Sequence, residues 1–169
     1  MKQFIETGKI VSTFGIKGEV KIYPWSDSAK SVAALKRLYI KGGKEVFAAN
    51  SRVHGDMVVS KLEGIDTVEA AEKLRGFVVY LNRDDVKLPK GVYFYTDLIG
   101  MDVTDADSGV VYGKLSEIFK GGSGEIYTVK RENGKEFMIP VIPETIVGTD
   151  VDKGVMKVRL LKGLIEDED

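Results

Sequence analysis

The sequence predicts an all-β protein built from two small modules, and three observations support this fold class. Short runs rich in Val, Ile, Tyr and Phe recur along all 169 residues and alternate apolar with polar positions, as strands with one wet face do. Turn-forming residues separate these runs at close intervals, which favours a small barrel or a sandwich over alternating β-α-β units. The polar, proline-containing stretch Asn82 to Lys90 divides the chain into nearly equal halves.

The first half is expected to hold six strands with tight turns between them. The expected strands are Phe4–Val11, Glu19–Tyr23, Leu38–Lys41, Glu45–Ala49, Met57–Leu62 and Phe77–Leu81. The stretch Thr13 to Ile22, TFGIKGEVKI, has two glycines around Lys17 and raises the question of a phosphate-binding loop. A strand pattern follows it where a phosphate loop requires a helix, so we interpret it as a turn.

Two short helices are expected between these strands. Asp66 is followed three residues later by Glu69, which predicts a capping box, and Gly76 supplies a left-handed stop. The second helix is expected over Ser28–Leu35, capped from Ser26-Asp27. Both helices are expected to pack over an opening of the first module.

The second half is expected to be another all-β module, beginning at Tyr93. Its expected strands are Met101–Thr104, Val110–Phe119, Ile126–Arg131, Glu136–Val141 and Val155–Leu161. Asn133-Gly134 is the strongest short-range hairpin signal in the chain. We therefore predict a first domain over residues 1–85, a linker over 86–92 and a second domain over 93–169.

The composition leaves little room for catalysis. The chain has no cysteine and one histidine, which excludes disulfides, thiolate metal sites, cysteine nucleophiles and multi-histidine metal sites. Asp105 and Asp107 resemble an EF-hand start, but Ser116 stands where the loop needs its glutamate. We expect no enzyme activity, no cofactor and no metal. The N-terminus carries Glu6 where a signal peptide needs an apolar run, so we expect a cytosolic protein.

The charge is distributed unevenly along the chain. Residues 1–50 carry nine Lys/Arg against four Asp/Glu, whereas residues 86–169 carry eleven against fifteen. A basic first half suits phosphates, and an acidic second half suits a basic protein. Either set of charges also serves simply to solvate the surface.

Two stretches of the second half have the composition of recognition segments. Tyr93, Phe94 and Tyr95 are adjacent, and neighbouring side chains of a strand point to opposite faces. At least one of these rings therefore faces either a partner protein or the first domain. Lys120 to Gly124 is glycine-rich and is expected to be either a mobile loop or a segment that fits against a partner backbone.

Several longer segments together resemble the RimM family of bacterial factors for small-subunit maturation. They are GKIVSTFGIKGEVKIYPWSD, KLEGIDTVEAAEKLRGFVVYL, YFYTDLIGMDV, GKLSEIFKGGSGEIYTVKR, EFMIPVIPE and VRLLKGLIE, and they span nearly all of residues 8–166. The resemblance implies a translation-factor-like N-terminal β-barrel followed by a PRC-barrel. It also implies a non-enzymatic assembly role with two partners: the head-domain ribosomal protein nineteen and nearby small-subunit rRNA.

The resemblance further implies which residues act. An aromatic pair ahead of the Asp-Leu-Ile-Gly segment maps onto Tyr93 and Phe94, where the family more often has two tyrosines, and Asp97 matches as well. The resemblance makes Lys9, Lys17 and Lys21 candidate rRNA contacts. The candidate partner-binding glycines, Gly121 and Gly122, come from the glycine-rich stretch itself.

Two other functions remain open from the sequence. One is a general RNA-binding or tRNA-escorting module, against which stands the lack of an evident Arg/aromatic pattern for stacking bases. The other is a membrane-associated scaffold, since PRC-barrels also occur beside photosynthetic reaction centres, but we see no membrane anchor in the sequence.

Overall fold

The structure is a computed structural model that describes residues 1–25 and 28–165. It divides into two compact units, one over Met1–Lys87 and one from Leu88 onward. Each unit is an all-β domain, so the predicted fold class is confirmed.

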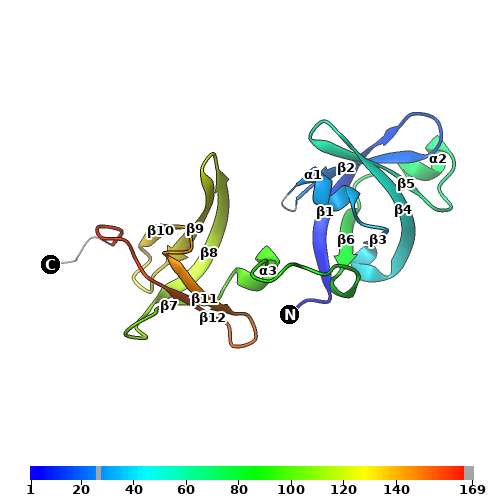
Figure 1. Cartoon of the computed structure of the whole chain (residues 1–169). Coiled ribbons are helices and arrows are strands. Elements are labelled where there is room, and N and C mark those ends of the chain that lie inside the picture. The colour runs from blue at the N-terminus through cyan, green and yellow to red at the C-terminus, as the bar shows by residue number, and fades with distance from the viewer. Residues whose placement is uncertain (26–27, 166–169) are drawn as a thin grey trace. The chain divides into compact units, whose positions relative to one another are not determined.

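The first domain is a closed barrel with the strand order β1-β2-β5-β4-β3-β6 (Figure 1). Neighbouring strands all pair antiparallel. The elements are β1 (Phe4–Phe14), β2 (Glu19–Pro24), α1 (Ala29–Ala33), β3 (Arg37–Ile40), the 3-10 turn η1 (Lys41–Gly43), β4 (Glu45–His54), β5 (Met57–Leu62), α2 (Val68–Glu72), β6 (Val78–Asn82) and the 3-10 turn η2 (Arg83–Asp85).

The barrel forms because alternate residues of each strand are apolar and point inward. Val20 and Ile22 of β2 are fully buried, while the intervening Lys21 is half-buried and Tyr23 is exposed. Ile10, Val58 and Val79 join them in one core cluster. All six predicted strands of this half are present, although β1 and β4 run several residues further than the alternation indicated.

The two helices of the first domain begin one or more residues later than predicted. Thr67 caps α2 through a hydrogen bond from the Ala70 amide, so Glu69 is not in the capping-box position. The predicted Asp66 cap was wrong by one residue, because Thr67 is also a good cap, and Asp66 instead forms an ion pair with Lys61 (2.8 Å). Ser28 caps α1. The predicted cap from Ser26-Asp27 lies outside the described residues.

The stretch from Gly15 to Gly18 is a turn joining β1 to β2, as predicted. Gly18 has φ +86°, and a Cβ built there would lie 2.5 Å from the Ile65 carbonyl oxygen. Only glycine fits both the left-handed backbone and this close approach to the β5–α2 loop.

The last residues of the first domain are tied to its body by side-chain hydrogen bonds. The Tyr39 hydroxyl donates to Asp85 (2.7 Å), and this hydrogen bond is the main cause of the raised pKa of Tyr39. The Gln3 amide donates to Asp84 (2.8 Å). The aspartate pair Asp84-Asp85 therefore has a structural use in η2.

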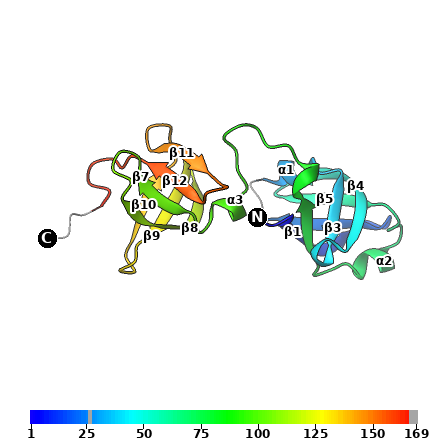
Figure 2. The ribbon, with the colours of Figure 1, turned by 90° about the horizontal axis from the view of Figure 1, so that it is seen from below.

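In the second domain, the described strands form one curved sheet with the order β10-β9-β8-β7-β12-β11 (Figure 2). Its elements are α3 (Tyr95–Leu98), β7 (Asp102–Asp105), β8 (Val111–Gly121), β9 (Gly124–Lys130), β10 (Glu136–Pro140), β11 (Ile146–Asp150) and β12 (Val155–Val158). β12 and β7 pair parallel, and the other neighbours pair antiparallel.

Two features of the second domain differ from the predictions. Tyr95 opens the helical turn α3 rather than continuing a strand, because the Asp97 and Ile99 amides bond back to Phe94 and Tyr95. The strand β11 was not predicted, since Gly148 interrupts its short alternation. The core of this domain is built around Val103, Val129, Ile139 and Val158.

Candidate functional site

The aromatic segment Tyr93 to Tyr95 lies at the entrance to the second domain, and all three side chains are half-buried. Tyr93 and Tyr95 pack against the core cluster of their own domain. The Tyr95 hydroxyl donates to Glu125 on β9 at 2.6 Å, and the Tyr93 hydroxyl lies 3.4 Å from the Thr149 carbonyl oxygen. The prediction that at least one of the three rings faces outward leaves the other two for the core, and Tyr93 and Tyr95 pack there.

Asp97 lies in α3 directly after the aromatic segment and is half-buried. Its amide donates to the Phe94 carbonyl oxygen at 3.0 Å, which closes the turn that holds the segment. Leu98, the next residue, is 2% exposed and anchors α3 in the core. The segment is therefore presented on a fixed helical turn.

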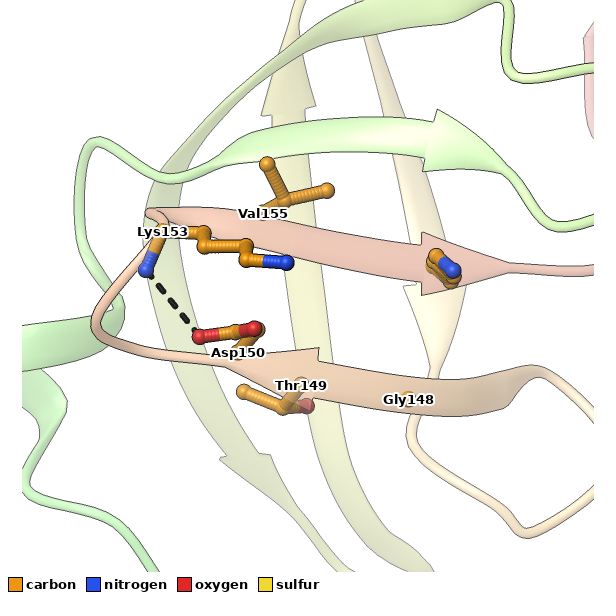
Figure 3. A pocket seen from close by; sticks show the side chains of 6 residues that line it. Gly148, Thr149, Asp150, Lys153 and Val155 are labelled. Atoms are coloured by element: carbon orange, nitrogen blue, oxygen red, sulfur yellow. Dashed lines mark hydrogen bonds between the residues drawn. The ribbon is translucent and has the colours of Figure 1, made fainter.

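A shallow depression of about 330 Å³ lies on the β11–β12 hairpin and includes the Tyr93 hydrogen-bond partner Thr149. Figure 3 shows Lys153 extended between Asp150 and Val155, with the Lys153 amide donating to Asp150 at 3.0 Å. The aromatic segment and the depression thus meet at Thr149. Together they form one candidate surface with apolar, cationic and carboxylate side chains.

Gly121 and Gly122 lie at the tip of the β8–β9 hairpin, where the connection between the two strands is short. Gly121 pairs with Gly124 in the ladder, so only Gly122 and Ser123 form the turn. The predicted loop over Lys120 to Gly124 is therefore shorter than expected, because the β8–β9 ladder includes Lys120, Gly121 and Gly124. Both glycines are exposed.

The three candidate rRNA-contacting lysines lie on β1, on β2 and in the turn between them. Lys9 is exposed and pairs with Tyr23 across the β1–β2 ladder, and Lys21 pairs with Ser12. Lys17 is exposed in the turn and lines a depression of about 340 Å³. The structure brings these lysines to the same side of the β1–β2 hairpin.

Other cationic residues of this surface were not singled out in the sequence. Arg52 of β4 donates hydrogen bonds from both of its terminal N–H groups to the carboxylate of Glu19 of β2, at 2.5 and 3.3 Å. This hydrogen bonding is the main reason that the pKa of Glu19 is lowered, and the charges of Arg52, Lys17 and Lys61 lower it further. Three cationic residues, from β4, β5 and the β1–β2 turn, therefore act on one carboxylate.

Aromatic rings accompany these cations. The Arg52 guanidinium lies 5.6 Å from the centre of the Phe14 ring, and the His54 ring meets Phe14 edge-on at 5.1 Å. His54, the single histidine of the chain, is exposed at the end of β4. The fold thus brings one arginine and two rings together from β1 and β4, with Phe14 half-buried and Arg52 paired with Glu19.

The described part of the chain has neither a metal-binding cluster nor a membrane-spanning helix. Among residues 1–25 and 28–165, no group of three or more His, Asp or Glu side chains is placed to hold a metal ion. Over the same ranges, no helix has the length and apolar character needed to cross a membrane.

Comparison with known families decides which family the two barrels represent. Residues 5–86 match the model of the RimM N-terminal domain, and residues 95–164 match that of the RimM PRC barrel domain. The chain belongs to the RimM family. Lys9, Lys17 and Lys21 fall within the first match, Asp97, Gly121 and Gly122 within the second, and Tyr93 and Phe94 just before it.

Two relatives of similar length support membership of the RimM family, and one solved structure is also similar to the chain. The chain is 39% identical to the ribosome maturation factor RimM of Acetivibrio thermocellus, with 99% of each protein aligned. It is 38% identical to the protein of the same name from Clostridium botulinum, with 96% of this chain and 97% of the relative aligned. A crystal structure of RimM from Pseudomonas aeruginosa is 27% identical over 93% of this chain and 97% of that one, with a TM-score of 0.47.

Proposed function

We propose that this RimM-family chain is a cytoplasmic, non-enzymatic assembly factor for the small ribosomal subunit. The observation that carries the proposal is the match of both RimM domains in order, together with relatives named ribosome maturation factors that align over nearly their whole length. In this proposal, residues 1–85 form the RNA-facing domain, 86–92 the linker and 93–169 the protein-binding domain.

The second domain is proposed to bind the head-domain ribosomal protein nineteen. The surface used would be the aromatic segment with the adjoining β11–β12 depression, because half-buried rings on a fixed turn lose little entropy on binding. The acidic balance of residues 86–169 supports a basic partner. Asp97, Gly121 and Gly122 are proposed contacts at the edges of this interaction.

The first domain is proposed to contact small-subunit rRNA near that protein. Lys9, Lys17 and Lys21 are cations at the surface of one hairpin. Lysine contacts to phosphate supply affinity and position without reading the sequence of the RNA. Binding at both domains would hold the immature head in a conformation that permits its folding and rRNA processing.

Cosedimentation with small subunits from cells that lack the endogenous factor tests the protein-binding surface. The Tyr93→Ala/Phe94→Ala double variant removes both rings, while Tyr93→Phe keeps the ring and removes only the hydroxyl bonded to Thr149. We expect the wild type and Tyr93→Phe to cosediment and the double variant to be lost from the subunit fraction. Circular dichroism and thermal melting confirm that each variant is folded.

The outcomes separate the surface from the function. If a folded double variant binds as well as the wild type, the aromatic segment has no part in subunit binding. If the wild type itself does not bind, the proposed assembly role is wrong.

A further inference from the structure

We propose that one outer face of the first barrel binds single-stranded RNA, with Tyr23 stacking on an unpaired base and lysines bonding its phosphates. This surface, the basic face, consists of Lys9, Ser12, Phe14, Lys21, Tyr23, Arg52 and His54. The inference rests on the proposed function only in naming ribosomal RNA as the physiological source of that strand.

The ladders of four neighbouring strands place these residues on one side of the sheet. Lys9 is opposite Tyr23 across the β1–β2 ladder. One further row runs from Ser12 to Lys21, then to Val59, then to Arg52. Opposed residues in antiparallel strands share a face, so the basic face extends continuously over β1, β2, β5 and β4.

Val59 is a buried apolar residue in the same row as the cations. Its register places it with Lys21 and Arg52 on the outer side, yet it is 0% exposed. Long cationic side chains cover apolar surface with their stems and keep their charges in water. Tyr23, in contrast, is 52% exposed, so its ring is accessible to a ligand.

The charge balance of the basic face favours an anionic ligand. Arg52 is occupied by Glu19, and Lys61 at the margin is occupied by Asp66. Lys9, Lys17 and Lys21 form no ion pair with any other described residue. Two of these cations, Lys9 and Lys21, lie beside the exposed Tyr23 ring, where they are available for phosphates.

The spacing of these groups fits a single strand better than a duplex. Neighbouring strands lie about 5 Å apart and alternate residues about 7 Å apart, so Lys9 and Lys21 flank Tyr23 on two sides. An unpaired nucleotide offers the face of its base for stacking and its phosphate for the lysines. A duplex keeps its base faces inside the stack, where Tyr23 finds no partner.

Fluorescence anisotropy of the full chain with a short labelled single-stranded RNA of mixed sequence tests the proposal. The same strand annealed to its complement serves as the duplex probe, and each affinity is measured over a series of salt concentrations. We expect tighter binding to the single strand than to the duplex. The only tryptophan in the chain, Trp25, is 46% exposed two residues after Tyr23, so its fluorescence gives a second signal.

Variants divide the interaction into stacking and charge. Tyr23→Ala is expected to weaken binding by at least about fivefold with an unchanged salt slope, because base stacking is lost but no phosphate contact is. Lys9→Ala/Lys21→Ala is expected to reduce the slope of log K against log salt by about 1.4. The matched control Lys36→Ala/Lys44→Ala removes the same charge on either side of β3, which neighbours none of β1, β2 and β5, and is expected to change neither quantity.

Three results would overturn the inference: a preference for duplex, wild-type affinity in Tyr23→Ala, or equal losses in the two lysine pairs. Cosedimentation of the same variants with immature small subunits keeps the two proposals apart. Subunit binding by a chain that does not bind free single strands removes this inference and leaves the assembly role intact. RNA binding by a chain that does not cosediment removes the assembly role and leaves the basic face as an RNA site.

Discussion

Replacement of Gly18 by alanine is expected to destabilise the first domain far more than the same replacement of Gly15. Both glycines belong to the turn between β1 and β2, and both have left-handed φ values of +86° and +64°. The left-handed backbone costs an alanine about 1–2 kcal/mol at either position. Alanine has less conformational entropy than glycine in the unfolded chain, and this difference affects the stability of both variants equally.

The difference between the two variants comes from what the added Cβ meets. At Gly18 it would lie 2.5 Å from the Ile65 carbonyl oxygen and 2.8 Å from the Thr67 nitrogen, whereas at Gly15 it meets no atom of the described residues within 4 Å. Ordinary van der Waals contact begins at 3.4 Å, so the hairpin must move by about 0.9 Å away from Ile65. The atoms in its way belong to the backbone of the β5–α2 loop, which cannot move as easily as the end of a side chain. Such overpacking costs about 1–3 kcal/mol.

Differential scanning calorimetry of the full chain measures this difference. For a domain of this size, each kcal/mol lowers Tm by about 4–8 °C, so Gly18→Ala is expected to melt at least about 4 °C below Gly15→Ala. Equal melting temperatures for the two variants would show that the β1–β2 turn is not closely packed against the β5–α2 loop.

Three further predictions concern stability. Tyr95→Phe removes the 2.6 Å hydrogen bond to Glu125 and is expected to lower the free energy of unfolding by about 1–2 kcal/mol in urea titrations, whereas an unchanged midpoint would contradict the anchoring role. Ile139→Ala, at a fully buried position of β10, is expected to cost about 2–5 kcal/mol, and a cost below about 1 kcal/mol would place Ile139 outside the core. Arg52 lowers the pKa of Glu19, so ionised Glu19 stabilises the fold above the unfolded-state pKa of 4.5, and this contribution is lost as the pH falls through the lower folded-state pKa. The stability deficit of Glu19→Gln, measured by urea titration, should therefore shrink below pH 4.5. A deficit that is constant with pH would contradict this role of the Glu19–Arg52 pair.

The strands of the fold were predictable because alternation is a local property of the chain. β5 begins and ends where its pattern predicted, at Met57 and Leu62. β11 was missed because Gly148 and a run of half-exposed residues weaken the same pattern. The cap of α2 was misplaced by one residue because Asp66 and Thr67 are both good caps; in the structure Thr67 caps the helix and Asp66 pairs with Lys61.

The candidate sites were less predictable because they depend on register and strand order. Lys9 and Lys21 were found from sequence, but their place beside Tyr23 follows from the β1–β2 ladder. Arg52 joins them only because β5 and β4 follow β2 in the barrel. The packing of Tyr93 against Thr149 likewise requires β11, which the sequence did not reveal.

The preference of the purified wild-type chain for immature small subunits tests the assembly role most directly. Equal amounts of immature small subunits, mature small subunits and large subunits are each sedimented with the chain, and the bound fraction is measured at several salt concentrations. We expect the chain to cosediment with immature small subunits in clear excess over the other two. Equal binding to large subunits and to immature small subunits would contradict the proposed function.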